Sequence, residues 1–447
     1  MAETFDLIIR GGTVVNHEGQ HRRDVGVRKG RTAALGDLAG AGAAEVVDAR
    51  GLHVLPGVID TQVHFREPGL EHKEDLESGS RAAVLGGVTA VFEMPNTRPP
   101  TVDGAALADK LERASGRMHC DYAFYVGATP ENARELPTLE RRAGVCGVKV
   151  FMGSSTGALL VADDEALEEV LRNINRRAAF HAEDEARLEE RKPLRREGEP
   201  ASHPVWRDEL TAYRATERLL RLAHRFGKRV HVLHVTTGEE MELLATHKTL
   251  ASVEVTPQHL TLAAPDCYER LGTYAQMNPP IRDSEQRRRL WQAVAAGVVD
   301  VLGSDHAPHT REEKEAPYPG SPSGMPGVQT LVPVMLDHVN AGRLSLERFV
   351  DLTSHGPNRL FGLARKGRLE VGYDADYTIV DLQAERTIED SWIASKCGWT
   401  PFAGRTVTGW PCGTIIRGQR VMWEDEIVTP SSGRPIAFRD TDSKARA

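Results

Sequence analysis

The sequence predicts an α/β protein: a (β/α)8 barrel of the TIM type with a small β-sandwich module built from both chain termini. Two patterns lead to this prediction. Short apolar runs typical of strands alternate with longer segments, such as 211–226, in which apolar residues recur at helical spacing. Polar residues suited to metal binding also stand within or just after several of these runs, at the rim where barrel enzymes place their chemistry.

The central part of the chain contains eight strand-like runs, the number that a parallel (β/α)8 barrel requires. These runs lie at residues 54–64, 90–94, 122–126, 145–152, 178–182, 230–235, 252–256 and 299–303. The helical segments between them are expected to cover the barrel.

Both ends of the chain lack the strand–helix alternation of the central part and contain short β-rich runs separated by glycine turns. The pattern occupies residues 6–48 and returns at 372–380 and 413–418. We therefore expect a discontinuous domain, with residues 1–52 plus 364–447 forming the β-sandwich and residues 53–363 forming the barrel.

Composition and charge restrict the class of protein. The chain has 447 residues and a formal net charge of −8, and its 56 Lys and Arg residues are spread along the sequence. This pattern argues against nucleic-acid binding and favours a small polar substrate. No membrane span or secretory signal is visible at the acidic N-terminus, so a cytoplasmic location is expected.

The cysteines favour a reducing compartment, because their number is odd and their spacing is not paired. We expect packing roles for all five, which are Cys120, Cys146, Cys267, Cys397 and Cys412.

Six candidate metal ligands are scattered over about half of the chain, each in or beside a strand-like run. They are Gln62, His64, Lys149, His181, His234 and Asp305. Imidazole and carboxylate groups suit Zn²⁺, and a catalytic zinc keeps one position open for water or substrate. A single strand histidine is more often structural, but several such positions at one barrel rim indicate a metal site for the hydrolysis or closure of a cyclic amide.

Two of these residues allow more than one interpretation. Lys149 could reach the rim or pair with a carboxylate, or its neutral amine could react with CO₂ to give a carbamate that bridges two metals. Asp305 could cap the next helix, or it could bind metal and transfer a proton from a metal-activated water to nitrogen.

The chain resembles the dihydroorotases, in the cyclic amidohydrolase group of the amidohydrolase superfamily, over nearly its whole length. The resemblance is carried by six segments: HFREPG at 64–69, MPNT at 94–97, FHAED at 180–184, HVLHV at 231–235, MNPPIR at 277–282 and SDHAPH at 304–309.

The resemblance implies a barrel with a terminal β module and a role for each candidate. His64 would bind the more buried metal, carboxylated Lys149 would bridge, His181 and His234 would bind the second metal, and Asp305 would be ligand and base. Arg66, Asn96 and His309 would bind the substrate carboxylate, and Asn278 would contact the ring. Alternatively, Arg66 could pair with Glu67 or Glu93, and the asparagines could be turn residues.

Gln62 departs from the family pattern, which has a histidine there. An amide oxygen is a weaker zinc ligand than imidazole, so we expect lower occupancy of the buried site or a single zinc per chain. The remaining ligands suffice for one catalytic zinc.

The function implied is the reversible interconversion of (S)-dihydroorotate and N-carbamoyl-L-aspartate. A hydantoinase-like or allantoinase-like hydrolase is one alternative, although the Arg66 and Asn96 pair is not expected there. An inactive partner of aspartate carbamoyltransferase is another, because loss of a metal histidine is how such degeneration could begin. A homo-oligomer, dimer or tetramer, is expected.

Two loops could lie over the site. Residues 191–200 are charged and turn-rich, so a solvated loop is favoured over a cover for the pocket, and residues 324–327 are either a flexible loop or a plain turn.

Overall fold

Eight parallel strands form a barrel in the order in which they occur along the chain. The structure is a computed structural model that describes residues 4–154 and 159–441. The barrel strands are β8 (Val58–Val63), β9 (Val88–Glu93), β10 (Asp121–Gly127), β11 (Val145–Phe151), β12 (Ala178–His181), β13 (Val230–Val232), β14 (Ala251–Val255) and β15 (Val301–Leu302). The ends of the sheet meet through a parallel bridge between Val63 and His306, and the His64 N–H donates to the His306 carbonyl at 2.7 Å.

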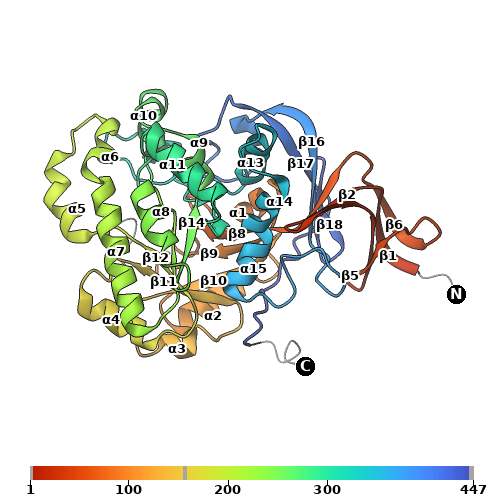
Figure 1. Ribbon diagram of the computed structural model, residues 1–447, viewed down its shortest axis with the longest axis horizontal. Helices are drawn as coiled ribbons and strands as arrows, with labels where there is room; N and C mark the ends of the chain where they lie inside the picture. The colour runs from red at the N-terminus through yellow and green to blue at the C-terminus, as the bar shows by residue number, and fades with distance from the viewer. Residues whose placement is uncertain (1–3, 155–158, 442–447) are drawn as a thin grey trace.

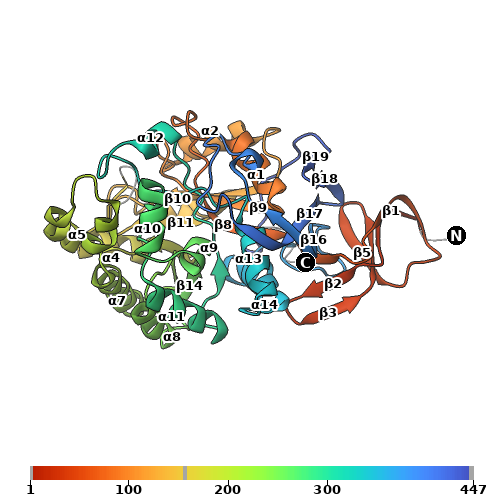
Figure 2. The same cartoon turned by 90° about the horizontal axis from the view of Figure 1, so that it is seen from above.

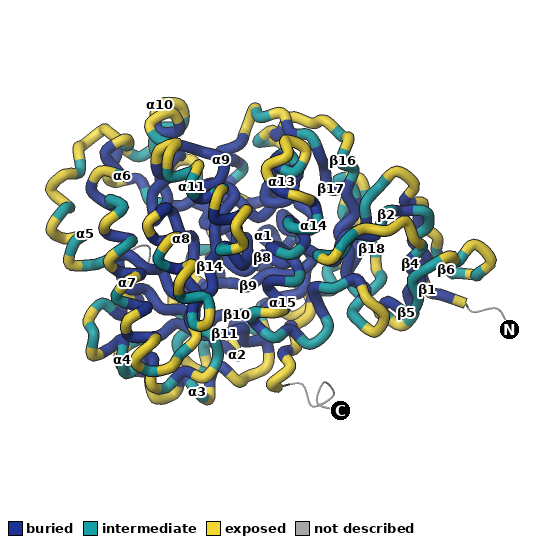
Figure 3. The backbone as a smooth tube through the Cα atoms, viewed as in Figure 1, coloured by how far each residue is buried: buried dark blue, intermediate teal, exposed yellow. Residues whose placement is uncertain are grey.

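Every residue in these eight strands is buried. Parallel strands covered by helices have no solvated face, so they appear in the sequence as continuous apolar runs. Figure 3 shows this interior as a buried centre surrounded by helices whose outer faces are exposed. The predicted barrel is confirmed.

Helices follow the strands and cover the barrel (Figures 1 and 2). Several begin at an aspartate whose carboxylate accepts a first-turn backbone N–H, as Asp75, Asp163 and Asp208 do. The α-helices are α1 (Leu76–Leu85), α2 (Gly104–Ala114), α3 (Leu136–Leu139), α4 (Asp164–Asn173), α5 (Glu185–Arg191), α6 (His203–Trp206), α7 (Glu209–Phe226), α8 (Gly238–Ala245), α9 (Pro257–Thr261), α10 (Asp266–Leu271), α11 (Ser284–Ala295), α12 (Arg311–Glu315), α13 (Leu331–Asn340), α14 (Leu346–Val350) and α15 (Gly356–Phe361).

The first predicted run, residues 54–64, is two strands in different sheets. β7 (His53–Pro56) pairs with strands of the terminal module, whereas β8 begins the barrel. Gly57 separates them, and a Cβ there would lie 2.2 Å from the Thr89 hydroxyl. A continuous apolar run does not reveal this change of sheet.

The two termini together build the expected β module. One sheet has the order β5-β4-β1-β6 and the other β19-β18-β17-β16-β7-β2-β3. The N-terminal strands are β1 (Thr4–Arg10), β2 (Thr13–Asn16), β3 (Gly19–Arg22), β4 (Asp24–Arg28), β5 (Arg31–Gly36) and β6 (Gly42–Asp48), and the C-terminal ones are β16 (Tyr377–Thr387), β17 (Thr406–Ile416), β18 (Gln419–Trp423) and β19 (Glu426–Ile427). Figure 1 shows strands from both termini side by side, with β1, β5 and β6 at one end of the long axis.

A shared core joins the two ends of the chain in this module. Leu7 and Val27 from the N-terminal strands pack in one cluster with Ile379 and Ile415 from the C-terminal strands. The domain limits at residues 52 and 364 remain a prediction. All five cysteines are free thiols, and four of them are buried. Among the described residues, no helix has the length and apolar character that crossing a membrane requires.

Candidate metal centre

The structure gathers all six predicted metal ligands around one small cavity at the carboxyl ends of the barrel strands. Gln62, His64, Lys149, His181, His234 and Asp305 line this space of about 20 Å³, together with Phe151, Asn278, Ala307, Ser323 and Gly324. A volume of this size holds about one water-sized group. Residues up to about 240 positions apart in sequence therefore face a common point.

The strongest donors form two pairs. His181 Nδ1 lies 3.0 Å from His234 Nε2, and His64 Nε2 lies 3.2 Å from Asp305 Oδ1. Two ligand atoms at about 2.1 Å from one Zn²⁺ lie roughly 3–3.4 Å apart, so each pair fits one ion. Within the described ranges, no group of three or more His, Cys, Asp or Glu side chains stands assembled as a metal site.

Glu183 orients His181. Its carboxylate accepts from His181 Nε2 at 2.9 Å, which leaves the Nδ1 lone pair toward His234. Burial raises the pKa of Glu183, but the Arg207 guanidinium and His181 outweigh burial and hold that pKa well below its usual range. The sequence analysis missed this carboxylate, although its position two residues after His181 at a strand end was a usable signal.

Asn96 orients His64 in the same way. The Asn96 amide oxygen lies 2.8 Å from His64 Nδ1, and because that oxygen can only accept, Nδ1 carries the proton. The Nε2 lone pair then points toward Asp305. Burial lowers the pKa of His64 to about 4 and that of His234 well below its usual value, so both rings are neutral, the form that binds metals.

Gln62 occupies the position of the missing histidine and points into the cavity. Its amide nitrogen donates to Asp305 Oδ1 at 2.9 Å. Its buried Oε1 has no hydrogen-bond partner in the described part of the chain. An orphaned acceptor beside two ligand pairs fits a cation in this cavity.

Lys149 is buried without a counter-ion. It is 1% exposed, and its Nζ lies 4.5 Å from the centre of the Phe151 ring. Among residues 4–154 and 159–441, no carboxylate lies within ion-pair distance of it, so the expected pairing is not found. Burial lowers the pKa of Lys149 to about 7, although Asp305 and Glu254 oppose this shift.

Three residues in this region have a left-handed backbone. Arg66, His234 and Asp305 have φ angles of 65°, 37° and 45°. Such conformations cost about 1–3 kcal/mol each in a non-glycine residue and persist where the surrounding fold imposes them, most often at functional sites.

Arg66 and His309 lie together next to this cavity. Arg66 Nη2 is 3.3 Å from His309 Nε2, and its Nε donates to the Pro308 carbonyl. The proposed pairing of Arg66 with Glu67 or Glu93 is not found, because Arg117 binds Glu67 and Lys110 binds Glu93. Arg66 therefore keeps a buried guanidinium for another anion.

Lys73 is a neighbour of this pair that the sequence analysis missed. Its Nζ lies 3.1 Å from His309 Nδ1 and 2.9 Å from Glu313. An ammonium can only donate, so His309 Nδ1 accepts and its Nε2–H donates to the Ser323 carbonyl at 3.0 Å. Arg66 Nη2 consequently finds no acceptor on that ring.

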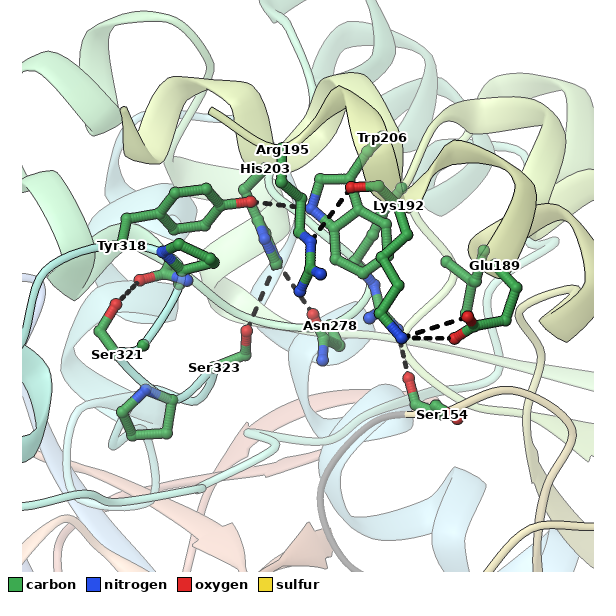
Figure 4. Close-up of a pocket in the computed structure, with 16 residues that line it drawn as sticks. Ser154, Glu189, Lys192, Arg195, His203, Trp206, Asn278, Tyr318, Ser321 and Ser323 are labelled. Carbon is green, nitrogen blue, oxygen red and sulfur yellow. Dashed lines mark hydrogen bonds and ion pairs between the residues drawn. The ribbon is translucent and has the colours of Figure 1, made fainter. Parts of the chain in front are cut away.

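Asn278 stands between the small cavity and a larger pocket of about 350 Å³ (Figure 4). Its Oδ1 accepts from His203 Nε2 at 3.0 Å, and Ser323 approaches the same nitrogen at 3.5 Å. Lys192 and Arg195 line the pocket, while most of the segment 191–200 is exposed, as expected for a solvated loop. Gly324 of the second candidate loop lines the small cavity.

Comparison with known proteins defines the class. Residues 53–421 match the family described as the Amidohydrolase family. The chain is 39% identical over 390 residues to a dihydroorotase of Halobacterium salinarum, covering 86% of this chain and 89% of that protein. It is also 36% identical over 447 residues to an allantoinase of Rubrobacter xylanophilus, covering 96% and 97%.

Solved structures lead to the same class of enzyme. An L-hydantoinase (dihydropyrimidinase) from Arthrobacter aurescens superposes with a TM-score of 0.92 at 33% identity, covering 97% of this chain and 100% of that one. The chain belongs to the amidohydrolase family. Its relatives carry several different enzyme names, so these names alone do not identify the substrate.

Proposed function

We propose that this amidohydrolase is a dihydroorotase, a zinc-dependent hydrolase that interconverts (S)-dihydroorotate and N-carbamoyl-L-aspartate in pyrimidine biosynthesis. The observation that carries the proposal is Arg66, which is 3% exposed and has no ion-pair partner among the described residues. A buried charge is costly unless it is paired. Dihydroorotate brings a carboxylate, whereas hydantoin and allantoin are neutral.

The candidate ligands would hold zinc. His64 and Asp305 supply one pair of donors and His181 and His234 the other, with Gln62 as the weakest donor. Lys149 would join the set once it is carboxylated. Bound zinc would lower the pKa of a water molecule and polarise the attacked carbonyl. These six candidate ligands are compatible with one or two zinc ions per chain. The weak amide ligand Gln62 favours a single ion.

Asp305 is proposed as the general base. Gln62 donates to its Oδ1, which fixes the carboxylate at the wall of the cavity. In hydrolysis, water adds its oxygen to the ring carbonyl, the ring C–N bond breaks, and Asp305 carries the proton of that water to the leaving nitrogen. Ring closure is the reverse.

The substrate would be oriented by a separate group of residues. Arg66 and His309 bind the carboxylate, the Asn96 amide contributes beside them, and Asn278 contacts the ring from the mouth of the larger pocket. Lys73 supports His309 by fixing its tautomer.

Carboxylation of Lys149 is part of the proposal. Its neutral amine would attack CO₂, lose a proton and form a carbamate, which replaces a costly buried cation with a metal ligand. Mass measurement on gently handled protein should show the mass of one CO₂ on the peptide that contains Lys149, and none in Lys149→Met. An unmodified amine in active protein would exclude the bridge.

Substrate competition tests the function. The kcat/KM for dihydroorotate should exceed that for hydantoin and allantoin, and Arg66→Gln should lower it at least about 30-fold, because loss of a buried charge pair costs roughly 2–5 kcal/mol. Residual activity on neutral hydantoin should stay unchanged in that variant. Absence of turnover with dihydroorotate in zinc-loaded protein would end the proposal.

Two alternatives remain testable. Relatives with those names favour a hydantoinase or an allantoinase. The same comparison of kcat/KM values distinguishes these enzymes from a dihydroorotase. An inactive partner of aspartate carbamoyltransferase is favoured by Gln62, and zinc content together with activity separates it. A cytoplasmic homo-oligomer, dimer or tetramer, belongs to the proposal, and light scattering on the purified chain tests its size.

A further inference from the structure

A second polar cavity lies at the opposite end of the barrel from the candidate metal centre. It measures about 300 Å³. Arg176 and Arg177 directly precede β12, and Arg229 directly precedes β13, so the cavity is at the amino ends of these strands. His181 ends β12 and His234 follows β13, which places the metal ligands at the other ends of the same strands. The two sites are therefore separate.

This cavity is strongly cationic. Its lining contains six arginines and one aspartate: Arg141, Arg176, Arg177, Arg229, Arg359, Arg439 and Asp440. Six positive charges and one negative charge leave a formal +5, in a chain whose net charge is −8. Guanidinium groups gathered in this way repel one another unless an anion joins them.

Internal ion pairs neutralise only part of that charge. Arg176 pairs with Asp440 at 2.6 Å, and Arg359 lies 3.5 Å from Asp300. Over the described ranges, Arg141 and Arg229 make no ion pair, and both are exposed at the cavity. Their charges remain available to a ligand.

Arg177 adds a buried donor to this group. Its Nη1 donates to the Val230 carbonyl at 2.8 Å, while its buried Nε has no hydrogen-bond partner among residues 4–154 and 159–441. Burial, followed by the neighbouring Arg229 charge, lowers the pKa of Arg177 to about 10. The like charges are thus close enough to affect one another.

A third cavity, of about 430 Å³, is also cationic and can be compared with the arginine cavity. It is also lined by several cations, but Lys366 there lies within 4 Å of Asp121, Asp374 and Asp376, and Arg417 also binds Asp121. Three of its six cations, Arg365, Lys366 and Arg417, are therefore paired with carboxylates. In the arginine cavity the ion pairs among the described residues involve only Arg176 and Arg359 of six arginines.

We propose that the arginine cavity binds a small phosphorylated anion carrying at least two phosphate groups. A guanidinium group can donate two parallel hydrogen bonds to the oxygens of one phosphate. Several guanidinium groups together therefore suit a ligand that carries several negative charges. A volume of about 300 Å³ lies at the lower end of small-molecule sites. Leu360 and Phe361 in the lining provide an apolar surface for an organic part of the ligand.

Calorimetric titration of the zinc-loaded full chain with inorganic pyrophosphate tests this proposal, and a nucleoside triphosphate forms the second arm. Pyrophosphate should bind to one site per chain with an affinity that falls as salt rises. Tighter binding of the nucleotide would show that the apolar surface also contributes, and equal binding would show recognition of the phosphates alone.

The double variant Arg141→Gln/Arg229→Gln should weaken pyrophosphate binding at least about tenfold. Both residues are exposed, so the fold should persist, and dihydroorotate turnover provides a check that is independent of this cavity. Arg214→Gln, at an exposed arginine on α7, is the matched control and should bind like the original protein. No binding by the original chain would overturn the proposal, and so would binding that persists in the double variant and disappears in Arg66→Gln.

Discussion

Gln62 is the residue on which the metal content depends. It contacts Asp305 and presents an orphaned amide oxygen to the cavity, and an amide oxygen is a weaker zinc ligand than imidazole. We expect metal analysis of the purified chain to find clearly fewer than two zinc ions. Gln62→His should raise that number toward two, and two tightly held ions in the original chain would contradict this account.

Glu183 is a second residue expected to affect zinc binding, because it orients the His181 ring. Replacing it with glutamine removes the negative charge that holds the His181 Nε2 proton, although an acceptor oxygen remains. Outer partners of metal-binding histidines are typically worth 10–100-fold in metal affinity. We therefore expect Glu183→Gln to weaken zinc binding by about that factor, measured by competition with a chelator.

Glu240→Gln provides the matched control for Glu183. Glu240 is also buried, but it accepts from Thr216 and Thr237 and contacts no candidate ligand. Its replacement should leave zinc affinity unchanged. Equal losses in both variants would mean that Glu183 acts only through general stability.

At the scale of elements, Gly57 is where the chain passes from the terminal module into the barrel. A side chain there meets the Thr89 hydroxyl at 2.2 Å and Asp376 at 3.0 Å. Overpacking of this kind typically costs about 1–3 kcal/mol. Gly57→Ala should lower the free energy of unfolding by that amount in a denaturant titration.

Gly40→Ala is the corresponding control. No heavy atom lies within 4 Å of a Cβ at Gly40, and its φ is not in the left-handed region. Its stability should therefore match the original within about 0.5 kcal/mol. If Gly57→Ala were equally neutral, the junction would not be tightly packed.

The existence of most elements could be predicted, but their ends could not. All eight barrel strands lie in or next to the predicted runs, because burial on both faces makes such strands mainly apolar. The run 54–64 was predicted as one strand, since periodicity does not distinguish β7 from β8. The segment 191–200 is exposed, as its charge predicted, but that charge does not show that Lys192 and Arg195 line a pocket.

For the whole molecule, buried histidines set the response to acid. Burial lowers the pKa of His64 and His259 to about 4 and that of His203, His309 and His338 to about 3. Between the unfolded pKa near 6.5 and these values, the unfolded chain binds more protons. Each histidine then removes up to about 1.4 kcal/mol of stability per pH unit as pH falls.

Buried acids with a raised pKa, among them Asp60 and Glu93, oppose this effect. Burial raises the pKa of Asp60 and Glu93 to about 7, so the folded state takes up their protons first and gains stability on acidification. The histidines outnumber them, and we expect the Tm to fall steeply between pH 6.5 and 4. His338→Gln, far from the metal ligands along the chain, should reduce that slope, and a flat Tm over this range would contradict the account.

The linear chain already specifies which residue types can do the chemistry and how the elements repeat. Apolar runs with period and length appropriate to strands, and imidazole, carboxylate and amine groups at their ends, are local properties of the sequence. They predicted the barrel, the terminal module and six of the residues that line the small cavity.

Only the folded molecule decided which of those residues touch, because contacts between distant strands depend on barrel closure and side-chain packing. The isolation of Lys149 and Arg66 from carboxylates and the orienting roles of Glu183, Asn96 and Lys73 arise in this way. So does the gathering of six arginines at the opposite end of the barrel, which no local pattern contains.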